Sequence, residues 1–162
     1  MNKTHITAVP GQPALTITRE FDAPRELVFK AHVDPVLYAQ WLGPRSHTMT
    51  IDVHEAHDGG RYRYHTEAEG QEVAFSGVFH EVTAPERIIA TWEFEGLPER
   101  GHIELTRMTF EDLPGGRSRL TSHSIYFSIE DRDAAMASGM EVGVVEGYER
   151  LDEVLAAMSE KA

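Results

Sequence analysis

Apolar and polar residues alternate along most of the first four-fifths of the chain, which is the pattern of half-buried β-strands. Residues 14–21 show it first, with Leu15 and Ile17 separated by a threonine. The alternation returns in six later segments bounded by turn residues: 48–53, 61–66, 73–82, 87–94, 103–110 and 118–127. We therefore predict about seven strands, mostly antiparallel because the connections are short.

Two short helices are predicted between the first strand and the rest. Asp22 suits an N-cap, Pro24 suits the first helical turn, and apolar residues at helical spacing follow until Pro35. A second helix begins there and ends before Gly43 and Pro44. The predicted order along the chain is therefore one strand, two short helices, six strands and one long helix.

The helical period returns over residues 131–159. Seven apolar residues recur at three- or four-residue steps and form one stripe: Met136, Met140, Val144, Tyr148, Leu151, Leu155 and Met158. Gly139, Gly143 and Gly147 lie along one edge of the stripe, although each glycine costs a helix about 0.5–1 kcal/mol relative to alanine. We expect this small-residue edge to pack closely on the two short helices, or to roof a ligand pocket, while the bulky edge faces the sheet.

The order of elements predicts an α+β domain over residues 14–162. A curved antiparallel sheet must cover its apolar face, and the long C-terminal helix is the only predicted element large enough to do so. Residues 1–13 contain Pro10, Gly11 and Pro13 and are predicted to form a flexible N-terminal arm. The chain is therefore expected to be one domain preceded by a short tail.

Charge and composition narrow the classes of partner. The 162 residues include 15 basic and 27 acidic side chains, which gives a net charge of −12 and argues against nucleic acid and anionic membranes as partners. The absence of cysteine excludes disulfides, thiol nucleophiles and cysteine-based metal sites. No apolar run suits a signal peptide or a membrane span. We expect a soluble, cytoplasmic protein without a cofactor.

Three stretches resemble one known family. They are "ITREFDAPRELVFKAHVDPVLYAQWLGP", "FSGVFHEVTAPERIIATWEF" and "SGMEVGVVEGYERLDEVL". Together they resemble the Activator of Hsp90 ATPase homologue 1-like family of the START/Bet v 1-like superfamily. The resemblance implies a helix-grip fold, in which the sheet wraps around the C-terminal helix and a central cavity holds a ligand. It also implies that relatives often form homodimers.

The chain departs from the family pattern at two places. Ala84 and Pro85 stand where the family commonly has two prolines, and Val144 stands where it usually has tryptophan. If the side chain at position 144 points inward, valine leaves a larger cavity than tryptophan would. The departure therefore bears on the size of any bound molecule.

Candidate ligand-binding residues come from the strands and the final helix. Aromatic residues recur at even spacing on successive strands, as expected for one concave apolar face, although an ordinary packed core would use the same residues. The candidates are Trp41, Tyr62, Tyr64, Phe75, Phe79, Trp92, Phe94, Met140, Val144 and Tyr148. Trp41 either lies at the cavity mouth or anchors its helix to the core.

Catalytic and metal sites have weaker support. Glu104 and His123 lie in neighbouring predicted strands and would form an acid–base pair if both faced the cavity, whereas a surface pair is the simpler interpretation. His54 and His57 are three residues apart at a strand end, which favours a solvated turn over a metal site.

We therefore predict a module that binds a small hydrophobic or amphipathic molecule. One alternative is a cyclase- or hydrolase-like enzyme that acts on a cavity-bound substrate, which requires a pair such as Glu104 and His123. The other is a stress-response or Hsp90 co-chaperone-like interaction protein, which requires an exposed apolar patch.

Overall fold

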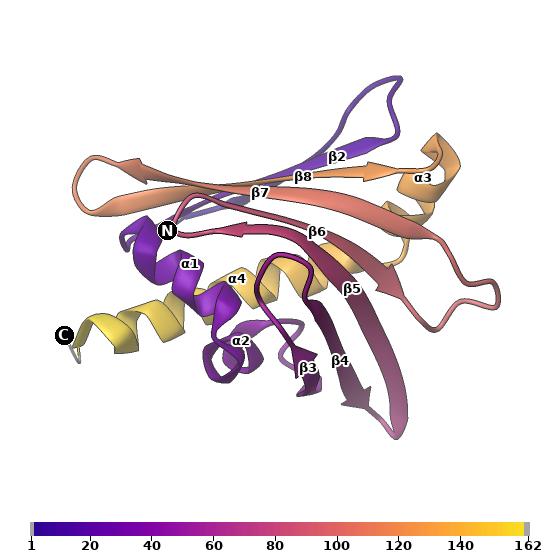
Figure 1. The fold of residues 1–162 in the computed structure, drawn as a ribbon, viewed down its shortest axis with the longest axis horizontal. Helices are drawn as coiled ribbons and strands as arrows, with labels where there is room; N and C mark the ends of the chain where they lie inside the picture. Colours follow the sequence, from indigo (N-terminus) through magenta and orange to yellow (C-terminus); the bar gives the residue numbers. More distant parts are fainter. Residues whose placement is uncertain (1, 161–162) are drawn as a thin grey trace.

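The computed structural model describes residues 2–160, which form eight strands and four helices (Figure 1). In chain order they are β1 (Thr4–Ala8), β2 (Ala14–Phe21), α1 (Arg25–Val33), α2 (Pro35–Trp41), β3 (Thr48–His54), β4 (Arg61–Ala68), β5 (Gln71–Thr83), β6 (Arg87–Phe94), β7 (Ile103–Leu113), β8 (Arg117–Tyr126), α3 (Ile129–Ala137) and α4 (Met140–Glu160). The predicted α+β helix-grip architecture is confirmed. Residue 1 of the predicted arm and residues 161–162 of the predicted domain lie outside the described residues.

All strands join one antiparallel sheet in the order β1-β2-β8-β7-β6-β5-β4-β3, with β1 and β3 at its edges. The sheet curves over α4, and α1 and α2 lie beside that helix on the same side of the sheet (Figure 1). The sheet thus has an inner face, turned toward the helices, and an outer face.

The N-terminal arm departs from its prediction, because residues 4–8 form strand β1. This strand pairs with β2 from Thr4 opposite Arg19 to Ala8 opposite Leu15. The buried Arg132 holds the connection between the two strands by donating hydrogen bonds to three carbonyl oxygens in residues 9–14. The flexible-arm prediction is therefore wrong for β1, because hydrogen bonds to β2 and a distant arginine decide its structure.

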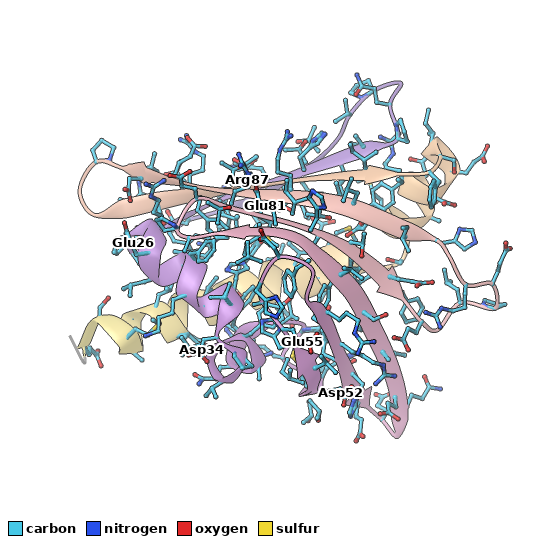
Figure 2. All side chains as sticks on the ribbon, viewed as in Figure 1. Glu26, Asp34, Asp52, Glu55, Glu81 and Arg87 are labelled. Carbon is cyan, nitrogen blue, oxygen red and sulfur yellow. The ribbon has the colours of Figure 1, made fainter. Side chains whose placement is uncertain are left out.

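The start of α1 also differs from its prediction. Pro24 occupies the N-cap position without a side-chain hydrogen bond, and Asp22 instead accepts a 3.0 Å hydrogen bond from Arg117. Asp34, at the junction of α1 and α2, caps the second helix by accepting from the backbone of Val36 (Figure 2). The prediction of Asp22 as an N-cap is wrong because a cationic partner from β8 takes its carboxylate.

The C-terminal helical segment is interrupted at Gly139, whose φ of +86° separates α3 from α4. Gly143 and Gly147 lie within α4 and face the segment after α2. A Cβ atom at Gly147 would lie 3.4 Å from the carbonyl oxygen of Trp41, and one at Gly143 would lie 3.6 Å from Pro44. Close packing on the end of α2 thus accounts for Gly147, whereas Gly143 has room for a Cβ atom and Gly139 is a helix terminator.

The core lies where the C-terminal half of α4 meets α1 and the centre of the sheet. Its least exposed large apolar residues include Phe21, Phe110 and Leu120 from the sheet, Val28 from α1 and Leu151 from α4. Arg19 enters this core from β2 and forms an ion pair with Asp152 on α4. One end of the grip is therefore closed by side chains.

Candidate functional site

The pairing of strands places the predicted aromatic residues of the sheet on its inner face. Tyr64 lies opposite Phe75, and Phe75 lies opposite Phe94. Residues two positions apart on a strand share a face, so the same side carries the rest of the set: Tyr62, Phe79 and Trp92. The structure therefore brings all six strand aromatics to the concave side.

Four of these rings form a continuous stack across three strands. Phe75 stacks on Tyr64 with 5.1 Å between ring centroids and 25° between planes, and on Trp92 with 5.1 Å and 27°. The centroid of Phe94 lies 5.4 Å from that of Phe75. Such offset contacts are favourable beyond the apolar area that they bury, so the rings support one another as a rigid surface.

Exposure divides the inner face into two ends. Tyr62, Tyr64 and Phe79 are buried, whereas Phe75, Trp92 and Phe94 remain partly exposed. We call these last three residues the aromatic wall. The apolar residues of α4 show the same difference in exposure. Leu151 in the second half of the helix is fully buried, while Met140 and Val144 in its first half are partly exposed. Solvent thus reaches apolar groups both on the inner face of the sheet and on the first half of α4.

Tyr62 is held in place by a contact that the sequence pattern did not reveal. Its hydroxyl donates a 2.5 Å hydrogen bond to the carbonyl oxygen of Thr91 on β6. The ring passes over Gly77, where a Cβ atom would lie 2.6 Å from the hydroxyl oxygen of Tyr62. Gly77 therefore allows the ring to cross β5. Its signal in the sequence is a glycine inside a strand, which marks close approach of a neighbouring group.

Polar groups flank the aromatic wall on the side of β7. Glu104 lies directly opposite Trp92 in the sheet and opposite Tyr126 on β8. Burial raises the pKa of the Glu104 carboxyl, and hydrogen bonding with the hydroxyls of Tyr126 and Thr106 opposes that rise. Burial and the neighbouring Glu104 also raise the pKa of Tyr126. The inner face thus combines apolar rings with a partly buried carboxyl group.

The predicted pair of Glu104 and His123 does not exist. Glu104 lies on the inner face, whereas His123 lies on the outer face, opposite Arg107, and shares a 3.1 Å hydrogen bond with Thr16. The alternation already separates them, because Glu104 is in phase with the buried Phe110 while His123 is out of phase with the buried Leu120. The acid–base pair is therefore wrong, and with it this form of the enzyme hypothesis.

Trp41 and Tyr148 belong to the closed end. The indole nitrogen of Trp41 donates a 2.9 Å hydrogen bond to the carbonyl oxygen of Ala31, and its ring stacks on Tyr148 with a centroid distance of 6.0 Å. Tyr148 also meets Phe21 edge to face at 5.6 Å. Of the two roles considered for Trp41, the structure shows the anchoring of α2 to the core.

Two hollows lie along β1 rather than against the aromatic wall. One, of about 280 Å³, is lined by residues including Lys3, His5 and Arg19. The other, of about 340 Å³, lies between β1 and the start of α4, with Ile6 and Met140 in its lining. Met140 therefore borders a hollow at the β1 edge of the sheet.

Three histidines, His54, His57 and His65, bear on the question of a metal site. His54 is partly buried, donates to the carbonyl oxygen of His32 at 3.1 Å and stacks on Tyr38, so the solvated-turn prediction is wrong for it but holds for the exposed His57. On the outer face, His65 interacts with Asp52 at 2.9 Å and with Glu72 at 3.2 Å. Its ring, Glu72 and Glu67 place their ligand atoms within 4.8 Å of one another. Because both glutamates are exposed and no further feature points to an ion, we assign no metal there.

The comparisons with solved structures confirm the fold. A protein from Rhodobacter sphaeroides is 29% identical, with a TM-score of 0.85 and coverage of 96% of this chain and 99% of its own. Protein Ms6760 from Mycobacterium smegmatis is 24% identical, with a TM-score of 0.85 and coverage of 94% and 97%. A protein from Arthrobacter aurescens is 25% identical, with a TM-score of 0.85 and coverage of 94% and 91%. These proteins share the architecture over nearly their whole length.

Three further findings concern membrane-spanning helices, curated relatives and the family of the chain. Within residues 2–160, no helix has the length and apolar character needed to cross a membrane. No curated protein matches the chain. The family model for Activator of Hsp90 ATPase homolog 1-like protein matches residues 22–156, which include both short helices, most of the sheet and nearly all of α4. The chain therefore belongs to the Activator of Hsp90 ATPase homolog 1-like family.

Proposed function

We propose that the protein binds a small hydrophobic or amphipathic molecule against the aromatic wall, on the side of the sheet that faces α4. The observation that carries the proposal is the partial exposure of Phe75, Trp92 and Phe94 on a concave face. Ligand sites typically combine apolar and aromatic walls with a few polar groups that orient the ligand. Glu104 and the Tyr126 hydroxyl supply such groups beside the wall.

The two ends of the inner face differ in how much apolar area they leave in contact with water. At the closed end, Tyr148 and Trp41 already cover one another. At the opposite end, which we call the open end, the aromatic wall keeps apolar area in contact with water. Removing apolar area from water stabilises a complex by about 25 cal/mol per Å². A ligand laid on the wall would gain this term without displacing core side chains, because the stacked rings are already held in position.

Calorimetric titration with 4-phenylbutanol, a neutral amphipathic probe, tests the proposal. We expect saturable binding to the wild-type chain and about tenfold weaker binding to Phe75→Ala, because that variant loses the ring at the centre of the stack. Leu105→Ala is the matched control, since Leu105 is 45% exposed on the outer face. Absence of saturable binding, or equal effects of the two substitutions, would contradict the proposal.

The interaction-protein alternative and the homodimer stay predictions. An interaction role needs exposed apolar area, and the outer face offers Leu105 and Ile125, which lie opposite each other on β7 and β8 and are 45% and 47% exposed. Nothing in the structure identifies what would cover this pair. The inner face therefore carries the proposal.

A further inference from the structure

We propose that the molecule bound at the aromatic wall is an amine, whose ammonium group lies between the carboxylate of Glu104 and the ring of Trp92. This inference rests on the proposed function and specifies the chemical class of its ligand. Three observations support it. They are the position of Glu104 beside Trp92 in the sheet, the direction from which other side chains contact the Trp92 ring, and the absence of a charged partner for the Glu104 carboxylate.

Glu104 lies directly beside Trp92 in the sheet. Trp92 on β6 and Glu104 on β7 are direct cross-strand partners with both side chains on the inner face. Side chains in such positions have Cβ atoms about 4.5–5.5 Å apart. A cation is attracted to an indole ring when it lies within about 6 Å of the ring centroid. An ammonium group above Trp92 would therefore also come within ion-pair distance of the Glu104 carboxylate.

The stacking and hydrogen-bond contacts of the Trp92 ring come from one side of β6. Phe75 stacks on Trp92 from β5, and the indole nitrogen is engaged by Tyr64 on β4. Both contacts come from the same side of β6, because β5 and β4 lie on one side of β6 in the sheet and β7 lies on the other. Within the part of the chain that the structure describes, no aromatic ring stacks on Trp92 from the side of β7, where Glu104 lies, and Trp92 is partly exposed, so we place the ligand on that side.

Glu104 differs from nearby glutamates because its carboxylate lacks a charged partner among the described residues. Among residues 2–160 its carboxylate has no salt bridge, and the partners that lower its pKa are the hydroxyls of Tyr126 and Thr106. Nearby glutamates on the outer side of the sheet are paired, Glu93 with Arg100 and Glu95 with Arg63. Burial of an unpaired carboxylate is costly, and this cost appears as the raised pKa of Glu104. A ligand cation would offset it.

The charge of the whole chain favours the same ligand. A net charge of −12 produces a negative potential that raises the local concentration of cations and lowers that of anions. This effect acts at any position on the molecule, so it cannot by itself select Glu104. The experiment therefore needs a control that changes the total charge equally without touching the inner face.

Three probes with the same phenylbutyl body separate the contributions: 4-phenylbutylamine, 4-phenylbutanol and 5-phenylpentanoate, titrated calorimetrically at pH 7 and constant ionic strength. We expect the amine to bind the wild-type chain at least tenfold more tightly than the alcohol, and the carboxylate to bind most weakly. Glu104→Gln should reduce the preference for the amine to less than threefold while affinity for the alcohol changes little.

Glu111→Gln is the matched control. Glu111 lies on the same strand as Glu104 but on the outer face, where it is exposed, and its substitution changes the total charge by the same amount. It should keep the tenfold preference for the amine. Circular dichroism of both variants verifies that the fold is retained.

The outcomes separate the two proposals. If the alcohol binds but the amine binds no more tightly, the assignment of an amine is overturned while the proposed binding function stands. If Glu104→Gln keeps the preference for the amine, the position of the ammonium group beside Glu104 is overturned. If none of the three probes gives saturable binding, both are overturned. A preference lost equally in Glu104→Gln and Glu111→Gln would reflect total charge and would also overturn the role of Glu104.

Discussion

The indole nitrogen of Trp92 donates a 3.1 Å hydrogen bond to the hydroxyl oxygen of Tyr64, although β5 lies between their two strands. Phe75 on that intervening strand stacks on both rings. Three strands are thus linked through side chains as well as through backbone hydrogen bonds. This linkage holds the indole of the aromatic wall in one orientation before any ligand binds.

Removal of either partner should lower stability by about 1 kcal/mol, the net worth of a typical intramolecular hydrogen bond. We expect this loss of unfolding free energy for Trp92→Phe and for Tyr64→Phe in urea titrations. Because both substitutions remove the same bond, the double variant should be only slightly less stable than either single one. Fully additive losses would contradict the linkage.

The glycines near the start of α4 should respond to alanine with opposite signs. Gly143 is helical, and an added Cβ would meet Pro44 at an ordinary contact distance of 3.6 Å. Gly143→Ala should therefore raise the unfolding free energy by about 0.5–1 kcal/mol. Gly139 has a φ of +86°, so Gly139→Ala should lower it by about 1 kcal/mol through backbone strain. Changes of the same sign in urea unfolding would refute this assignment.

Two adjacent carboxylates on α4 should differ strongly in their contribution to stability. Asp152 accepts hydrogen bonds of 3.0 and 2.6 Å from Arg19, whose side chain is 1% exposed. Asp152→Ala would leave a buried guanidinium unpaired and should cost about 3 kcal/mol. Glu153 pairs with the exposed Arg45, so Glu153→Ala should cost less than about 1 kcal/mol. Equal losses in denaturant unfolding would show that the burial of Arg19 is unimportant.

Acid should destabilise the fold through His32. Burial lowers the pKa of this histidine from 6.5 to about 4, while its ring donates to the carbonyl oxygen of Val28. The unfolded chain therefore takes up a proton first as the pH falls. The stabilising contribution of neutral His32 is present above pH 6.5 and is lost between pH 6.5 and 4, at up to about 1.4 kcal/mol per pH unit.

Other groups require a comparison between variants to isolate this effect. Burial also lowers the pKa of His54, whereas ion pairs raise the pKa of His65 and of His102, whose contributions have the opposite sign. The slope of unfolding free energy between pH 7.5 and 5 should be smaller in His32→Gln than in the wild-type chain. The exposed His57→Gln should keep the wild-type slope. An unchanged slope in His32→Gln would contradict the prediction.

The sequence by itself determined the order of the elements from β2 onward, except for the break between α3 and α4, and it predicted that the aromatic residues of the strands share one face. Both follow from local periods, because side chains alternate along a strand and recur every 3.6 residues along a helix. The same alternation also separates Glu104 from His123, since each can be compared with a buried neighbour on its own strand. The burial of those neighbours comes from the structure, so the alternation alone left the faces of Glu104 and His123 open.

Tertiary structure decided the features that depend on distant partners. Strand β1 forms because it pairs with β2. Asp22 does not cap α1 because its carboxylate binds Arg117 on β8. The pairing of Trp92 with Glu104 depends on the alignment of β6 with β7, and the difference between the closed and open ends depends on how far α4 follows the curved sheet. The local period determines the face of a helix or strand on which a side chain lies. The residues that this side chain contacts are determined only by the packing of distant elements.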